Sequence, residues 1–211
     1  MMNNTEIRAF DFEVRAENDE DRGDYLEGRA IVYNEPTTLF NKDIGEYQET
    51  IEAGALDEAD LKDVRFLINH NTDMIPLARS RNNTENSTMR MVPDDEGMMI
   101  RANLDTENNA DAKSLYSATT RGDISGMSFM FVVGADRWED IDTEMPKRYI
   151  TSIKRIMEVS ACTFPAYAAT SLEARGLLPA LDNAAASLEN EKAKAKAIAD
   201  KKQAIKILCE V

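Results

Sequence analysis

The sequence holds few side chains suited to acid–base chemistry, because its 211 residues include a single histidine, His70. Any mechanism or metal site that needs two imidazoles from one chain is therefore excluded. Apolar residues alternate with polar ones over residues 64–70, which predicts a strand with residues 64, 66, 68 and 70 on one face. His70 is thus expected at the core-facing end of that strand. A lone histidine in such a place is more often structural than catalytic.

Ser128 is the second candidate for chemistry. Residues 122–133 run from a glycine-rich turn into an apolar strand. Gly126 removes a side chain beside Ser128, which leaves room for a substrate carbonyl to approach the hydroxyl. The alternative is a serine that begins a strand and bonds to the backbone, which is common. The pattern differs from the nucleophile elbow of α/β-hydrolases, in which GxSxG is followed by a helix.

Residues 155–167 contain the third group of candidates. An extended backbone places Glu158, Ser160 and Cys162 on one face and Met157, Val159 and Ala161 on the other. Burial of the Glu158 carboxylate among apolar neighbours requires a partner, because an unpaired buried charge is strongly destabilising. The partner is His70 in a catalytic arrangement, or Lys154 or Arg155 in a structural one.

The elements that would position these residues are mostly short strands. Strands are predicted near residues 7–14, 25–33, 47–51, 64–70, 89–92, 98–104, 127–133, 148–153 and 155–162. A polar loop or hairpin tip is expected over residues 17–24. One helix is expected from Asp105 or Thr106 to Arg121, with Ala112, Leu115, Tyr116 and Thr119 on its buried face and Gly122 at its end. Strands without regular strand–helix alternation favour a mainly β fold with helices (α+β), a β-barrel or sandwich decorated by helices.

Charge and composition narrow the function classes. The chain carries 25 basic and 39 acidic side chains, a formal net charge of −14. Because nucleic-acid phosphates would repel a chain this acidic, no nucleic-acid partner is expected. The N-terminus lacks the features of a signal peptide, and no apolar run approaches the roughly 20 residues that span a bilayer. Two cysteines give neither a disulfide framework nor a zinc motif, which favours a reducing cytoplasm and no cofactor.

The end of the chain differs in composition from the rest. Residues 182–211 contain no Gly or Pro and hold six Lys against five acidic residues. We therefore predict a folded domain over residues 1–175 and an Ala/Lys-rich helical or disordered tail over residues 176–211. The tail is interpreted either as a docking or removable segment or as a plain solvated helix.

Taken together, the segments resemble the prohead (capsid-maturation) serine proteases of tailed bacteriophages, whose fold is related to that of the herpesvirus assemblin proteases. The resemblance covers about residues 6–175 and rests on five stretches in the same order: residues 28–33 (GRAIVY), 52–56 (EAGAL), 67–71 with 76–79 (LINHN, PLAR), 126–131 (GMSFMF) and 158–167 (EVSACTFPAY). Departures are minor: Ala53 stands where Pro is frequent, and Ala78 and Met130 where Gly is frequent.

The resemblance implies a herpesvirus-protease-like barrel and a serine endopeptidase packaged in the immature procapsid, in the host cytoplasm. Such enzymes cleave scaffold or major capsid protein precursors and often themselves, and a homodimer is the implied state. By the match, His70 is the general base and Ser128 the nucleophile. Assemblin-type enzymes use a second histidine as the third member, and this sequence has none. Glu158 is the proposed substitute.

Three other functions remain open at this stage. A scaffold or capsid-assembly protein could use the same fold only for binding. Metal-assisted hydrolysis would use His70 with acidic side chains such as Asp73, although the spacing typical of zinc enzymes is missing. A cysteine peptidase would pair Cys162 with His70. Self-cleavage or docking is expected in the segment beyond residues 177–179.

Overall fold

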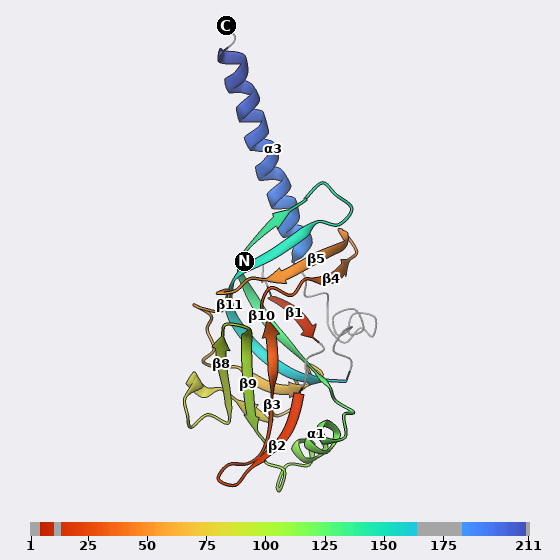
Figure 1. Cartoon of the computed structure of the whole chain (residues 1–211), viewed down its shortest axis with the longest axis vertical. Helices are drawn as coiled ribbons and strands as arrows, with labels where there is room; N and C mark the ends of the chain where they lie inside the picture. Colours follow the sequence, from red (N-terminus) through yellow and green to blue (C-terminus); the bar gives the residue numbers. More distant parts are fainter. Residues whose placement is uncertain (1–4, 11–13, 164–182, 210–211) are drawn as a thin grey trace.

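The computed structural model describes residues 5–10, 14–163 and 183–209. These residues form a mixed α+β fold composed mostly of strands, with two α-helices and a short 3₁₀ helix (Figure 1). The strands are β1 (Thr5–Phe10), β2 (Val14–Asp19), β3 (Gly23–Val32), β4 (Thr37–Asn41), β5 (Gly45–Ile51), β6 (Arg65–Ile68), β7 (Ala78–Arg79), β8 (Met89–Asp94), β9 (Gly97–Asn103), β10 (Gly126–Glu139) and β11 (Lys147–Cys162). The helices are η1 (Arg81–Asn83), α1 (Ala110–Thr120) and α3 (Ala184–Cys209).

The described strands form two sheets and no closed barrel. One sheet has seven strands in the order β1-β10-β11-β5-β4, with β6 and β7 branching from β11, and the other has four in the order β2-β3-β9-β8. The predicted mainly β, helix-decorated fold is confirmed, whereas the predicted barrel is not found in this part of the chain. The physical reason lies in β11, which pairs in parallel with β5 at one end and with β6 at the other. The sheet therefore branches there, and its edge strands β1 and β4 are not joined.

The strands β10 and β11 are the two longest strands and lie next to each other in the middle of the larger sheet. They pair antiparallel over their whole lengths, from Gly126 opposite Cys162 to Glu139 opposite Lys147. Four irregularities in register interrupt this ladder, and such bulges bend and twist a strand. The predicted separate strands over residues 148–153 and 155–162 are thus one long curved strand. Both of the later candidate segments lie on this single pair of strands.

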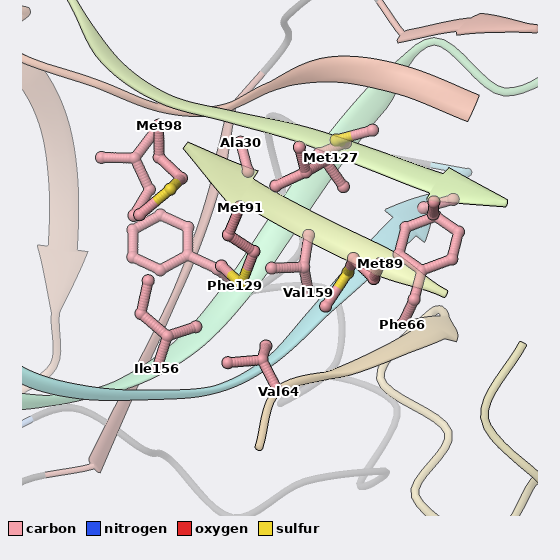
Figure 2. Close-up of a cluster of buried hydrophobic side chains, with 14 of the residues drawn as sticks. Ala30, Val64, Phe66, Met89, Met91, Met98, Met127, Phe129, Ile156 and Val159 are labelled. Atoms are coloured by element: carbon pink, nitrogen blue, oxygen red, sulfur yellow. The ribbon is translucent and has the colours of Figure 1, made fainter. Parts of the chain in front are cut away.

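The main hydrophobic core is built by apolar side chains from both sheets (Figure 2). Phe129 of β10 and Val159 of β11 are fully buried there, beside Phe66 of β6. Methionines of the smaller sheet fill the space opposite them; unbranched side chains suit an irregular gap because they adapt their shape. They include Met89, Met91 and Met98, all at most 1% exposed.

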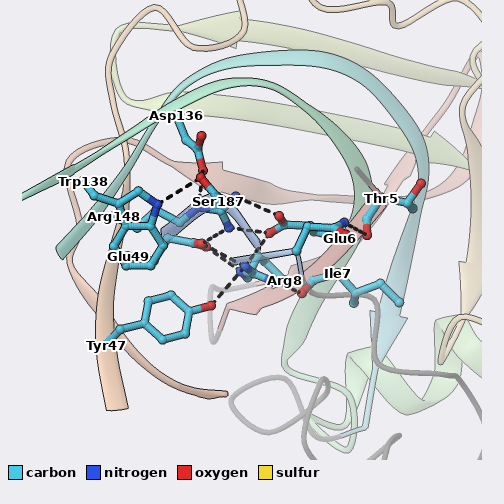
Figure 3. A network of polar contacts seen from close by, with 11 residues as sticks. Thr5, Glu6, Ile7, Arg8, Tyr47, Glu49, Asp136, Trp138, Arg148 and Ser187 are labelled. Atoms are coloured by element: carbon cyan, nitrogen blue, oxygen red, sulfur yellow. Dashed lines mark hydrogen bonds and ion pairs between the residues drawn. The ribbon is translucent and has the colours of Figure 1, made fainter. Parts of the chain in front are cut away.

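Four buried charged residues form a second, polar centre (Figure 3). Arg8 of β1 bonds Glu49 of β5 through Nε (2.5 Å) and Nη2 (2.8 Å) and also reaches Glu6. Arg148 of β11 bonds Glu6 through Nη1 (2.8 Å) and Nη2 (2.9 Å), and its Nε bonds Asp136 (2.6 Å). Burial disfavours the charged guanidinium of Arg148, but Glu6 and Glu49 hold its pKa above the ordinary value. These ion pairs attach β1 to β5 and β11.

Helix α1 and the β2–β3 hairpin test two of the local predictions made outside the site. Helix α1 begins later than expected, at Ala110, because the Asn109 side chain accepts the N–H groups of Asp111 and Ala112 and so caps the helix. Ala112, Leu115 and Thr119 are buried as predicted. Residues 17–24 form the tip of the β2–β3 hairpin, one of the two predicted alternatives, and its ladder satisfies the backbone of these polar residues.

Helix α3 is 26 residues long and begins within the predicted tail. Its first turns pack on the body, where Ala184 and Leu188 join Tyr47 and Trp138 in a small buried cluster. The rest of the helix extends away from the sheets (Figure 1). The predicted boundary between residues 175 and 176 and the expected cleavage segment lie outside the described residues.

We predict that Arg148→Leu lowers the free energy of unfolding by about 3–5 kcal/mol, because it leaves the buried carboxylates of Glu6 and Glu49 short of a cation. Urea denaturation measures the loss. Arg121→Leu is the matched control: Arg121 pairs with Asp123 at the surface, so its removal leaves the unfolding midpoint nearly unchanged. A loss at Arg148 no larger than at Arg121 would contradict the assigned role of the buried network.

Candidate active site

His70 leaves its strand through a left-handed turn. Strand β6 ends at Ile68, and Asn69 (φ 49°) and His70 (φ 57°) both adopt the left-handed conformation. This conformation is uncommon for residues with a side chain and occurs most often for Asn, Asp and His. The predicted core-facing position of His70 is therefore wrong: the turn breaks the alternation of the strand. The imidazole is buried, yet it lies outside the main core, against β11.

The His70 ring pairs with Glu158. Nδ1 lies 2.5 Å from Glu158 Oε1, and both side chains are almost fully buried. An ionised carboxylate can only accept, so Nδ1 is the donor to it, and in the neutral imidazole Nε2 then carries the lone pair on the other side of the ring. The choice left open by the sequence is thus decided in favour of His70 as the carboxylate's partner. Arg155 instead lies 3.9 Å from Asp60.

A bulge in β11 turns Glu158 to the outer face of the sheet. Glu158 pairs with Met130, whereas the next residue of β10, Phe131, pairs with Ile156, so Met157 is an extra residue. Ile156 and Val159 both face the core, and the extra residue between them allows Glu158 to point away from it. Without the bulge, the alternation counted from Ile156 would direct the carboxylate into the core.

Ser128 lies on the neighbouring strand, on the same outer face. Met127 and Phe129 point into the core, so Ser128 points to the opposite side, directly across from Ser160. Its hydroxyl donates to the backbone carbonyl of Arg8 in β1, with an Oγ–O distance of 2.7 Å. The side chain is fully buried. In this arrangement the Ser128 proton is directed to β1 and not to the imidazole.

Cys162 lies beside the imidazole. Its Sγ is 3.9 Å from His70 Nε2 and 3.7 Å from the backbone carbonyl oxygen of Ser160. Burial, reinforced by the negative charge of Glu158, raises the pKa of the Cys162 thiol to about 12. A thiol with so high a pKa stays protonated near neutral pH, whereas a cysteine nucleophile acts as the thiolate. This disfavours the cysteine-peptidase alternative.

Two features of the site have no role in the sequence-based prediction. The Ser160 hydroxyl donates to Glu158 Oε2 (2.6 Å) and accepts the backbone N–H of His70 (3.1 Å). The Asn69 side chain exchanges hydrogen bonds with Thr163. Alternation alone places Ser160 on the same face as Glu158. Its contact with His70 depends on the parallel pairing of β6 with β11, which no local pattern indicates.

An apolar cleft of about 280 Å³ opens beside the carboxylate. Its walls come from strands β6, β10 and β11 and from the loop after His70: Leu67, Met130, Met157, Glu158, Thr72, Met74, Pro76 and Arg65. Met130 is two residues from Ser128 on the same strand, so the cleft lies roughly 7 Å from the serine along β10. The cleft and the polar side chains therefore share one face.

The structure therefore brings the three predicted residues, His70, Ser128 and Glu158, to one place on the β10–β11 pair. Comparison with known proteins identifies the family of the chain. Residues 10–183, which include all three, match the family described as caudovirus prohead serine protease. The chain belongs to this family.

Two individual proteins are similar to this chain. The prohead protease of Enterobacteria phage HK97 is 31% identical over 144 residues, which are 67% of this chain and 55% of the HK97 protein. The match thus spans about half the length of that relative. The structure of the bacteriophage T4 capsid assembly protease gp21 covers 76% of this chain and 99% of its own, with 13% identity and a TM-score of 0.36.

The described residues contain no group of three or more His, Cys, Asp or Glu side chains placed to hold a metal ion. Asp73, the suggested second ligand, is exposed, whereas His70 is buried against Glu158. The metal-assisted alternative therefore lacks a ligand set in this part of the chain. None of the described helices is long and apolar enough to cross a membrane.

We predict that Cys162 of the native protein resists alkylation by iodoacetamide. Near pH 8, a thiol with a pKa of about 12 is ionised in roughly one molecule in ten thousand. Mass spectrometry of the peptide that contains Cys162 should show no adduct after a time in which urea-denatured protein is fully modified. Rapid modification of the native protein would reveal a reactive thiolate and reinstate the cysteine-peptidase hypothesis.

Proposed function

We propose that this chain is a serine endopeptidase in which Ser128 is the nucleophile, His70 the general base and Glu158 the residue that orients and stabilises the imidazole. The observation that carries the proposal is the buried 2.5 Å contact between His70 Nδ1 and Glu158 Oε1, on the face that also presents Ser128. A buried carboxylate, an imidazole whose Nε2 faces away from that carboxylate and a hydroxyl on the neighbouring strand are the parts of acyl-transfer catalysis.

The proposed chemistry follows from these groups. The Ser128 Oγ attacks the carbonyl carbon of the scissile peptide while His70 Nε2 takes the hydroxyl proton. The imidazolium then gives that proton to the leaving amine, and the C–N bond breaks to leave an acyl-enzyme. Water attacks the ester by the same route and releases the acid. Throughout, Glu158 keeps Nδ1 protonated and stabilises the positive charge on the ring.

The observed geometry is a resting arrangement for this chemistry. Ser128 Oγ donates to the Arg8 carbonyl, and Cys162 Sγ occupies the space next to Nε2. Attack requires the Ser128 hydroxyl to exchange the Arg8 carbonyl for Nε2. This exchange would combine a rotation of the Ser128 side chain with a shift of Cys162 away from Nε2. Catalytic hydrogen bonds commonly tighten only when substrate is bound.

The substrates we propose are the scaffold protein or the major capsid protein precursor of a tailed phage. Membership of the prohead protease family supports this substrate class. Cleavage would take place inside the immature procapsid in the host cytoplasm, without nucleic acid or membrane as partner. The homodimer and self-cleavage remain predictions that follow from the family resemblance.

A purely binding role, as a scaffold or assembly protein, has less support. Binding does not require a carboxylate to be buried against an imidazole beside a hydroxyl, and such burial costs free energy. The buried contact is explained by catalysis and left unexplained by binding.

We predict that Ser128→Ala and His70→Ala each reduce cleavage of a co-expressed capsid-protein precursor by at least about a thousandfold, because members of a catalytic triad act as a unit. Intact-mass analysis of the precursor measures cleavage. Ser125→Ala, at an exposed serine three residues earlier, should cleave at the wild-type rate. Wild-type processing by either site variant would refute the assignment. Labelling of Ser128 by a fluorophosphonate separates a peptidase from a scaffold.

A further inference from the structure

Ser160 forms hydrogen bonds with both residues of the His70–Glu158 pair. Its single hydroxyl proton goes to Glu158 Oε2 (2.6 Å), and its oxygen accepts the backbone N–H of His70 (3.1 Å). The side chain is fully buried. Because Oε2 is held by Ser160, Oε1 is the carboxylate oxygen left for Nδ1 of the imidazole. The rotation of the carboxylate and the place of the imidazole are thus set by one hydroxyl.

The backbone of His70 needs such support. Two consecutive residues with side chains, Asn69 and His70, hold the left-handed conformation, which persists only where the surroundings impose it. Strand β11 supplies these restraints. Besides the Ser160 contact, Ala161 O accepts the N–H of Asn69 (3.0 Å), and the Asn69 side chain accepts the N–H of Thr163 (3.0 Å).

We propose that Ser160 is a positioning residue of this peptidase, which fixes the Glu158 carboxylate and the His70 backbone in the register that catalysis uses. The proposal rests on the proposed function, in which His70 is the base and Glu158 its partner. Ser160 acts through these two residues and contacts no reacting atom. Loss of its hydroxyl leaves a buried carboxylate oxygen and a buried N–H without a partner.

The test compares Ser160→Thr with Ser160→Val, two side chains of the same shape that differ by the hydroxyl. Because His70 is the only histidine, protein labelled with ¹⁵N-histidine gives one set of imidazole NMR signals. Wild-type and Ser160→Thr should show the strongly downfield Nδ1 proton of a short hydrogen bond to a carboxylate. In Ser160→Val this signal should move upfield or disappear. Ser152→Ala, on the same strand but away from the site, is the control.

Precursor cleavage is the second measurement. Ser160→Val should cleave about tenfold to a hundredfold more slowly than Ser160→Thr, the effect of losing one hydrogen bond to a charged group. An unchanged Nδ1 signal and rate in Ser160→Val would overturn the positioning role. If no variant cleaves, wild type included, the proposed function fails, while the NMR comparison still decides whether Ser160 positions the pair.

Helix α3 supports a second, independent inference. The family match ends at residue 183, directly before the helix begins. Among the described residues, the base of the helix is attached by Ala184, Leu188 and two hydrogen bonds of Ser187, whose Oγ accepts from Trp138 Nε1 and donates to Asp136. Farther along, Ile198 and Ile205 are 55% and 61% exposed. At 3.6 residues per turn these two isoleucines share a stripe with Ala195 and the anchored Leu188, and two charged residues, Glu191 and Lys202, lie on the same stripe.

Charge indicates which partner this stripe suits. Residues 184–209 hold six Lys and three acidic residues, a net charge of +3, so the remaining residues of the chain carry −17. Lys194 and Lys201 border the stripe on one side and Lys192 borders it on the other. Two copies of α3 would place lysines against lysines at these bordering positions, which disfavours self-pairing. An acidic helix would pair favourably at the same positions.

We propose that α3 is a docking arm for an acidic amphipathic helix of a partner protein. The stripe is narrow, carries Lys202 between Ile198 and Ile205 and is bordered by further lysines, which suits a helix pair whose other member is acidic. A membrane surface requires a broader apolar face, usually with aromatic residues, and α3 has none.

The probe is a fluorescein-labelled helical peptide with Leu at its core positions and Glu at the bordering positions. Fluorescence anisotropy with the full-length chain should show binding that weakens as salt rises, and about tenfold or greater weakening in Ile198→Asp. Ala193→Asp introduces the same charge on another face of the helix and should bind within about twofold of wild type.

Three outcomes would overturn the docking proposal. One is equal binding of Ile198→Asp and wild type, and another is equal binding of a peptide with Lys in place of Glu. The third is preference for another surface: self-association that Ile198→Asp abolishes in light scattering, or tighter binding to vesicles of anionic lipid than to the acidic peptide.

Discussion

The site depends on the pairing of one buried carboxylate with the only imidazole of the chain. A carboxylate removed from water is strongly destabilising unless a cation or hydrogen-bond donors face it. Glu158 is almost fully buried, and both its oxygens are satisfied, one by His70 and one by Ser160. On the other side of the ring, Nε2 lies 3.9 Å from Cys162 Sγ. The pair can form because β6 and β10 both pair with β11.

Two departures from regular strand geometry make the pairing possible. The extra residue at Met157 sends Glu158 to the outer face while Ile156 and Val159 stay in the core. The left-handed turn at Asn69 and His70 redirects the imidazole across β11. A regular strand at either place would bury one partner in the apolar core, apart from the other. Bulges and left-handed residues of this kind concentrate at functional sites because they re-aim side chains.

Residue types and short-range patterns predict much of this arrangement. The lone histidine, the Gly126–Ser128 strand start and the alternation around Glu158 identify the three residues and show that Glu158 needs a partner. The five matching stretches assign their roles through the family resemblance. The open sheets, the bulge at Met157 and the hydrogen bonds of Ser160 arise from pairings between residues about 30 to 90 positions apart, such as β6 with β11. Local periodicity carries no information about such pairings.

Arg8 connects the two buried polar centres of the molecule. Its guanidinium belongs to the ion pairs with Glu6 and Glu49, and its backbone carbonyl accepts the Ser128 hydroxyl. The ion pairs fix β1 along β10, and the position of β1 in turn fixes the carbonyl that holds the serine proton. A change in the charge balance of the buried network therefore reaches Ser128 through the backbone of one residue. Ser128, the proposed nucleophile, is thus coupled to the charged network through the backbone of Arg8 and not through a side chain that contacts the imidazole.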